Sequence, residues 1–219
     1  MIKYIEKPNK EEEIFNILNP LVKEWFKNKF RTFCIPQQFG VMPIHSRENV
    51  LISSPTGSGK TLTAFLSILN ELIDSSEKGI LEDKIYCVYI SPLKALSSDI
   101  QINLLEPLRE MEAITGKKLN IRVAVRTGDT EASEKSKMLA KPPHILITTP
   151  ESLAIVLSSI KFVELLKDVQ WCIVDEVHAL AENKRGTHLS LSLERLQKLS
   201  PAMARIGLSA TIAPLDEIA

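Results

Sequence analysis

The sequence is short of cysteine and of long apolar runs. Its three cysteines, Cys34, Cys87 and Cys172, are widely spaced and form no C-x-x-C pair. Such spacing indicates neither a disulfide framework nor a zinc site, and it favours a reducing compartment. No apolar run reaches the roughly 18 residues that cross a bilayer, and the opening MIKYIEKPNKEEE is charged where a signal peptide is apolar. We therefore expect a soluble, cytoplasmic protein without a membrane partner.

An excess of charge of one sign is also missing. Lys and Arg together number 27, as do Asp and Glu, so no global field attracts nucleic acid or anionic lipid. Any polyanion must be held by local contacts. With 44% hydrophobic residues, 25% charged residues and only 8 glycines among 219 residues, the chain can bury one sizeable core. We expect a globular domain.

Short β-branched runs alternate with longer helical patterns from Val50 onward. This alternation predicts the α/β class, with a mostly parallel sheet and helices on both of its faces. The runs are almost continuously apolar, as expected of strands that are covered on both sides. The expected strands are VLISS, IYCVYIS, IRVAVR (121–126), HILITT (144–149), WCIVDE (171–176) and ARIGLSA (204–210).

The first 48 residues have a different character. KEEEIFNILN and PLVKEWFKNKF read as two amphipathic helical pieces, broken at Asn19-Pro20 because proline starts helices and interrupts them. We expect an N-terminal helical segment over 1–48 that packs on an α/β domain over 49–219. The polar stretch TEASEKSKMLAKP (130–142) predicts an exposed helix.

The stretch SSPTGSGKTL (53–62) lies between an expected strand and an expected helix, which is the context of a phosphate-binding loop. Its glycines let backbone N–H groups turn inward, Lys60 can reach terminal phosphates, and the Thr61 hydroxyl can ligate Mg²⁺. Ser54 stands where the strict G-x-x-x-x-G-K-[ST] pattern has glycine, and the alternative reading is a plain Gly/Ser turn. The candidate cofactor-binding residues here are Pro55, Thr56, Gly57, Ser58, Gly59, Lys60 and Thr61.

In WCIVDEVH (171–178), two acids follow the end of an apolar strand, where open α/β sheets place ligand sites. Asp175 is expected to hold Mg²⁺ and Glu176 to orient or deprotonate the attacking water. The alternative is that both acids cap the next helix. The phosphate-binding loop makes the Mg²⁺·ATP reading the better one.

Asp175-Glu176-Val177-His178 is similar to the DExH box of superfamily 2 helicases and translocases, and further short motifs resemble that superfamily in the expected order. NKRGTHLSLSLERL most resembles the large helicase-related (Lhr) family, with the Ski2-like helicases second. Gln37, 23 residues before Lys60, resembles the adenine-reading glutamine, and Gln38 is one residue off in spacing. The other matching residues are Ser91, Pro92 and Lys94, Thr127 and Gly128, Thr149 and Pro150, and Ser209 and Thr211.

The resemblance implies a RecA-like motor domain that binds ATP and Mg²⁺. It implies that Lys60, Asp175, Glu176 and His178 serve ATP hydrolysis, that Thr61 and Asp175 hold the metal, and that Gln37 reads adenine. Ser209 and Thr211 would relay the nucleotide state to the nucleic-acid face. There, strand ends at Ser91-Pro92 and Thr149-Pro150 open helices and offer hydroxyls and N–H groups to phosphate oxygens; simple helix capping is the alternative.

Several other side chains invite a functional reading. Arg126, like Lys94, is as plausible in solvent as on a nucleic acid. His144 and His188 are expected to be structural, and the aromatic residues from Trp25 to Phe33 to pack in a core and not against bases. Leu189, Leu193 and Leu196 predict a buried stripe, with Lys184, Arg185 and Arg195 left as open candidates for nucleic-acid contacts.

No second set of motor motifs occurs in the sequence. The family uses a second RecA-like domain, so we expect this chain, monomeric by itself, to belong to a longer protein that carries one. The favoured function is ATP-driven movement along, or unwinding of, single-stranded or partly duplex nucleic acid, DNA favoured over RNA. The alternatives are a P-loop phosphotransferase and a nucleic-acid-binding ATP switch without unwinding.

Overall fold

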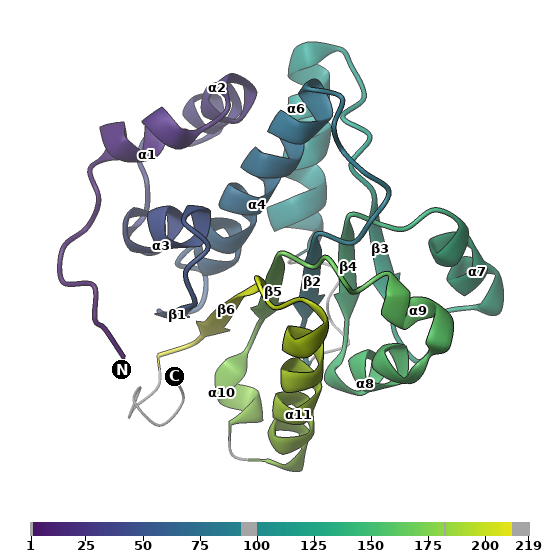
Figure 1. The fold of residues 1–219 in the computed structure, drawn as a ribbon. Helices are drawn as coiled ribbons and strands as arrows, with labels where there is room; N and C mark the ends of the chain where they lie inside the picture. The colour runs from purple at the N-terminus through teal and green to yellow at the C-terminus, as the bar shows by residue number, and fades with distance from the viewer. Residues whose placement is uncertain (1, 93–99, 182, 212–219) are drawn as a thin grey trace. The chain divides into compact units, whose positions relative to one another are not determined.

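The structure is a computed structural model that describes residues 2–92, 100–181 and 183–211. They fall into two units. The first unit comprises Met1–Leu81, Ala95–Ile121 and Ala210–Ala219, and the second comprises Glu82–Lys94 and Arg122–Ser209. Figure 1 shows the elements of both units. The predicted boundary between residues 48 and 49 is a different division and stays a prediction.

The first unit is mainly helical. The predicted break at Asn19-Pro20 is confirmed, because the first helix ends at Ile17 and the second begins at Pro20. A third helix over IPQQFGVMPIH was not predicted, since two prolines and a glycine dilute its helical pattern. The elements are α1 (Glu11–Ile17), α2 (Pro20–Lys29), α3 (Ile35–His45), β1 (Val50–Ser53), α4 (Lys60–Glu77), the π-helix η1 (Gln101–Leu105) and α6 (Glu106–Thr115).

Helix α4 is the element on which α3 packs, while α2 contacts both α4 and α6. The Asn19 N–H, at the start of α2, donates to Asn70 Oδ1 on α4 over 2.6 Å. Helix α3 approaches closely enough that a Cβ on Gly40 would lie 2.8 Å from side-chain atoms of Ile52 and Thr63. The rings of Phe26 and Phe33 stack at 4.3 Å and both are buried, so the prediction that these aromatic residues form core is confirmed.

The second unit contains five parallel strands, which confirms the predicted mostly parallel sheet. Their order is β6-β5-β2-β4-β3. All five lie within the apolar runs that predicted them. The elements are β2 (Cys87–Ile90), β3 (Val123–Arg126), α7 (Ala132–Ala140), β4 (Ile145–Thr148), α8 (Pro150–Ser158), α9 (Ile160–Glu164), β5 (Trp171–Val174), α10 (Val177–Leu180), α11 (Lys184–Leu199) and β6 (Ala204–Ser209).

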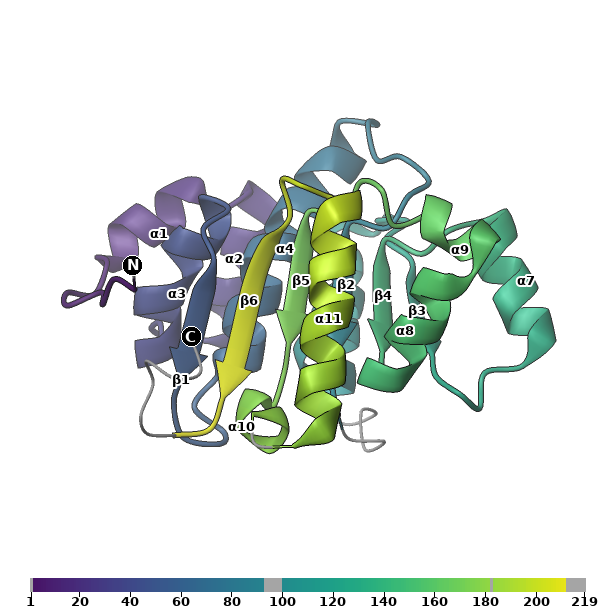
Figure 2. The same cartoon turned by 60° about the horizontal axis from the view of Figure 1, so that its bottom comes forward.

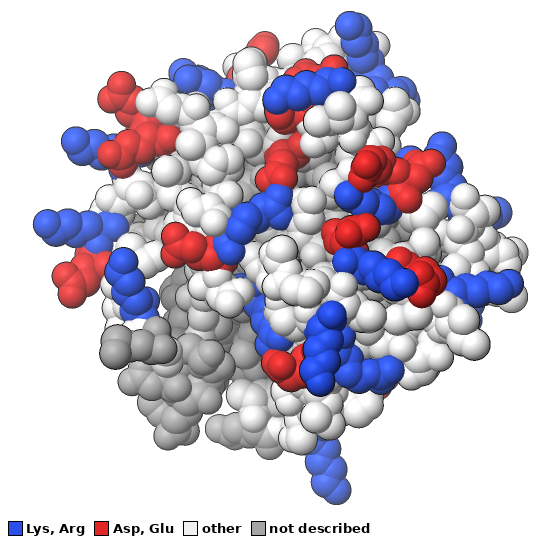
Figure 3. Space-filling model, viewed as in Figure 1, with Lys and Arg blue, Asp and Glu red and all other residues white. Residues whose placement is uncertain are grey.

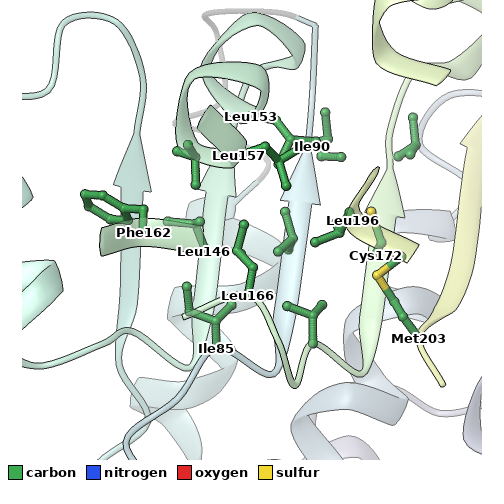
Figure 4. Close-up of a cluster of buried hydrophobic side chains, with 14 of the residues drawn as sticks. Ile85, Ile90, Leu146, Leu153, Leu157, Phe162, Leu166, Cys172, Leu196 and Met203 are labelled. Carbon is green, nitrogen blue, oxygen red and sulfur yellow. The ribbon is translucent and has the colours of Figure 1, made fainter. Parts of the chain in front are cut away.

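One apolar cluster joins the strands of the second unit to α8, α9 and α11, which lie in front of them in Figure 2. Leu189 and Leu196 are buried in it and Leu193 packs at its border, so the predicted stripe on α11 is confirmed. Burial of such side chains contributes about 1.5–3 kcal/mol each. Figure 4 shows Ile85, Ile90, Leu146, Leu153, Leu157, Phe162, Leu166, Cys172, Leu196 and Met203 of this cluster.

Charges of both signs are interspersed on the face shown in Figure 3, in keeping with equal numbers of acidic and basic residues. The three cysteines are free thiols.

Within residues 2–92, 100–181 and 183–211, no helix is both long enough and apolar enough to cross a membrane.

Candidate functional site

The phosphate-loop residues of the first unit lie between β1 and α4, as predicted. Gly57 and Gly59 have φ angles of 77° and 94°, which L side chains rarely adopt. A Cβ at Gly59 would also lie 2.7 Å from Cys34 Sγ. Position 59 therefore requires glycine for both conformation and space.

Ser54 fits the loop although the strict pattern has glycine there. It is not among the residues with positive φ, and its hydroxyl lies 2.7 Å from the Ser58 hydroxyl. The pair links the two ends of the loop. The departure from the pattern thus leaves the loop with an additional internal hydrogen bond.

Lys60 begins α4, and its side chain folds back over the loop. The residue is buried, and Nζ lies 3.5 Å from the Ser54 carbonyl oxygen and 3.4 Å from that of Pro55. These contacts are long and are made to neutral oxygens. A phosphate would offer the ammonium a stronger, charge-assisted partner. Thr61, half-buried, follows in the first turn of the same helix.

Gln37 lies beside the loop in the first unit. Its Oε1 accepts a hydrogen bond from the Cys34 N–H over 2.9 Å, which caps α3 and fixes the amide. Its Nε2 would lie 3.9 Å from a Cβ on Gly59. Gln38 points elsewhere and donates to the Phe33 carbonyl. The structure therefore favours Gln37 over Gln38 as the side chain at the loop, while its adenine contact stays a prediction.

The two acids of the second unit follow β5 and are held in different ways. Asp175 is buried, and its carboxylate accepts from the Glu176 N–H over 2.8 Å and from the Tyr89 hydroxyl. Glu176 is half-buried and adopts a left-handed conformation with φ of 53°. Non-glycine residues in this conformation are uncommon and gather at functional sites.

His178 continues this series of contacts. Its Nε2 lies 3.0 Å from Glu176 Oε2, and its Nδ1 lies 3.4 Å from the Ser209 hydroxyl at the end of β6. The second unit thus brings Tyr89, Asp175, Glu176, His178 and Ser209 into one series of polar contacts. The sequence analysis missed Tyr89. The one available signal was a hydroxyl within an otherwise apolar, fully buried strand.

The strand ends predicted to contact nucleic acid also lie in the second unit. Thr149 caps α8 by accepting from the Ser152 N–H over 3.3 Å, and Pro150 is the first helical residue. Thr127 and Thr130 form a turn in which the Thr127 N–H donates to the Thr130 hydroxyl, and nothing lies within 4 Å of a Cβ on Gly128. Thr149 therefore caps a helix, as the alternative reading expected, and the nucleic-acid role of Thr149 stays a prediction.

The other residues proposed for nucleic-acid contact or coupling are Ser91, Pro92, Lys94 and Thr211. Ser91 is buried, and its N–H donates to the Thr148 carbonyl. The Pro92 carbonyl accepts from Arg185. Thr211 is exposed. Lys94 lies outside the described residues.

The structure shows contacts for two arginines that the sequence left as open candidates. Arg126 is buried and lies 4.4 Å over the ring of Phe162. Burial lowers the pKa of its guanidinium. Arg185 pairs with Glu151 and is described below.

The structural reading of His144 is confirmed. It is buried and accepts from the Arg122 N–H over 3.0 Å, and burial, followed by the charge of Arg122, lowers its pKa to about 4. A neutral imidazole is thus part of the fold. Among the described residues, no three His, Cys, Asp or Glu side chains converge as metal ligands.

Comparison with known proteins gives the family. The DEAD/DEAH box helicase model matches residues 35–218. The chain is 62% identical to "ATP-dependent helicase Lhr-Core protein 2" of Thermococcus barophilus, over 100% of this chain and 26% of that relative. It is 42% identical to the Lhr helicase/uracil glycosylase of Escherichia coli, over 98% of this chain and 14% of that relative. The chain thus spans only about a quarter of the first relative's length and about a seventh of the second's.

Solved structures agree with this assignment. The Mycobacterium smegmatis helicase Lhr, bound to ssDNA and AMP-PNP, has a TM-score of 0.84 and 43% identity over 94% of this chain and 26% of that one. Mss116p, at 21% identity and a TM-score of 0.79 over 99% of this chain and 43% of that one, supports the RecA-like fold alone. The predicted resemblance to Lhr proteins is confirmed, and the chain belongs to the DEAD/DEAH box helicase family.

Proposed function

We propose that this chain is the ATP-binding motor domain of an ATP-dependent nucleic-acid helicase or translocase. One observation carries the proposal: the series of polar contacts that runs from Asp175 through Glu176 and His178 to Ser209. A P-loop phosphotransferase needs the loop and a carboxylate, but it has no use for a histidine and a serine that extend the series. A motor needs such an extension because it must couple nucleotide state to its polymer.

In this mechanism each group has a separate task. The backbone N–H groups of residues 55–61 and the Lys60 ammonium bind the phosphates of ATP, and Gln37 binds adenine. Glu176 holds the attacking water and accepts its proton. His178 keeps the Glu176 carboxylate oriented and links it to Ser209.

The proposed Mg²⁺ ligands are Thr61 and Asp175, whose side-chain oxygens are the type of ligand that Mg²⁺ prefers. Mg²⁺ usually keeps several waters and takes one or two protein oxygens together with substrate phosphates, so a protein cage of three acids is not expected. Each carboxylate oxygen of Asp175 accepts one hydrogen bond and keeps a further lone pair that could bind the ion. The bound ion would neutralise charge on the phosphates during transfer.

The proposed partners are single-stranded or partly duplex nucleic acid, DNA in preference to RNA, and a second RecA-like domain of the same protein. The smegmatis helicase bound to ssDNA supports the choice of DNA. The free thiols are compatible with the cytoplasm, which we propose as the location.

Strand displacement by the full-length protein tests the function. We expect ATP-dependent unwinding of a partly duplex DNA and ATP turnover that rises when single-stranded DNA is added. Glu176→Gln, purified in the same way, controls for contaminating ATPases. Turnover that is robust but indifferent to both DNA and RNA would exclude a motor and return the phosphotransferase to first place.

Tyr89→Phe tests the support of the metal-binding carboxylate. The substitution removes one donor from Asp175 and leaves a buried carboxylate oxygen short of a partner, which costs about 1–3 kcal/mol. We expect a severalfold rise in the Mg²⁺ concentration that gives half-maximal ATPase activity. A Mg²⁺ titration measures this, with denaturant unfolding as the check on stability. An unchanged Mg²⁺ dependence would mean that Tyr89 is purely structural.

A further inference from the structure

Arg185, in the first turn of α11, makes contacts far along the chain within the second unit. Its Nε donates to Glu151 Oε1 over 2.6 Å, and its Nη2 lies 3.3 Å from Glu151 Oε2. The same Nη2 donates to the Pro92 carbonyl oxygen over 3.0 Å. One guanidinium therefore links three segments: the start of α11, the first turn of α8 and the residues just after β2.

Two of these segments are the proposed nucleic-acid loops. Pro92 follows Ser91 directly, and Glu151 follows Thr149 and Pro150. A guanidinium is a planar fork whose N–H directions are fixed relative to one another. Donating to Glu151 and to the Pro92 carbonyl at once therefore fixes the separation of the two loops.

The third segment is coupled to the residues that follow Glu176. Asn183 caps α11 by accepting from the N–H groups of Arg185 and Gly186, and its own amide donates to the Ala179 carbonyl over 2.6 Å. A Cβ on Gly186 would lie 2.0 Å from the Leu180 carbonyl oxygen. The start of α11 is thus in direct contact with the backbone of α10, which also carries His178.

We propose that Arg185 is a positioning residue that transmits changes at the Glu176–His178 pair to the two nucleic-acid loops. A shift of α10 would move the start of α11, and Arg185 would move Pro92 and Glu151 together. This inference rests on the proposed function, since it needs the two loops to contact a polymer.

A purely stabilising role is the competing explanation. The side chains of Arg185 and Glu151 are 44% and 53% exposed, and ion pairs this exposed contribute little to folding. Their loss is therefore expected to leave the fold intact. The chain also offers a control ion pair that involves the same helix: Arg205 of β6 pairs with Glu194 of α11 over 2.9 Å.

The test compares Arg185→Gln with Arg205→Gln in the full-length protein. ATPase rate is measured against the concentration of a single-stranded oligonucleotide, which separates maximal rate from the half-stimulating concentration. Networks of this kind carry about 0.5–2 kcal/mol of coupling, so we expect Arg185→Gln to raise the half-stimulating concentration about 2- to 30-fold. Arg205→Gln should match the wild type.

Two further variants keep the test decisive. Glu151→Gln removes the ion pair from the α8 side and should shift the half-stimulating concentration in the same direction. Arg185→Lys supplies charge without the fork, so it should recover the response only in part. If Arg185→Gln and Glu151→Gln both follow the Arg205→Gln curve, the inference is wrong. If the wild type itself shows no stimulation by DNA or RNA, the proposed function fails instead.

Discussion

Glu176→Gln should lower the rate of ATP hydrolysis by about 10²–10⁴-fold, the contribution typical of a positioned general base. The amide keeps the size and shape of the side chain but cannot accept the proton of the attacking water. ATP binding should persist, because the groups proposed to bind the phosphates are the N–H groups of residues 55–61 and the Lys60 ammonium, and not Glu176. Single-turnover hydrolysis of pre-bound ATP in the full-length protein measures the first quantity, and a fluorescent-nucleotide titration measures the second.

The contacts of Glu176 add a second expectation for the same variant. A glutamine can still accept the hydrogen bond from His178 Nε2, so the link to Ser209 should survive. DNA binding in the presence of ATP should then match the wild type or exceed it, since the ATP-bound state is no longer depleted. Loss of ATP affinity with an unchanged hydrolysis rate would contradict the assigned role.

Lys60→Ala should weaken ATP binding by about 10- to 150-fold, which corresponds to losing a charge-assisted contact of about 1.5–3 kcal/mol. Among the residues that the structure describes, the Nζ partners are the carbonyl oxygens of Ser54 and Pro55 at 3.4–3.5 Å, so the loss of Lys60 should cost the folded protein little. Isothermal titration with ATP and Mg²⁺ measures the affinity, and thermal unfolding checks the fold.

Lys60→Arg is the matched control for this prediction. It keeps the charge but places a larger, planar group in a buried position, so we expect intermediate affinity. Wild-type ATP affinity in Lys60→Ala would remove the phosphate contact from the mechanism and leave the Gly/Ser turn as the better interpretation of the loop.

The sequence was sufficient for the elements whose signal is local. Each of the six strands lies inside an apolar run that predicted it, because strands covered on both faces must be apolar along their whole length. The break at Asn19-Pro20 was predicted for the same kind of reason, since proline acts on its immediate neighbours. Helix α3 was missed because Pro36, Gly40 and Pro43 weaken the helical pattern. It is held by its packing on Ile52 and Thr63, which no local signal reveals.

The candidate site divides in the same way. By itself the sequence determined the place of the candidate phosphate loop between a strand and a helix, the two acids after β5 and their order along the chain, because these motifs are short and continuous. The tertiary structure alone decided that Tyr89 donates to Asp175 across 86 residues of chain, and that Arg185 joins Glu151 and Pro92 across 34 and 93 residues. Such contacts depend on which strands pair and which helices cover them. Sheet order and helix packing are set by burial of the whole core and not by the residues next to each contact.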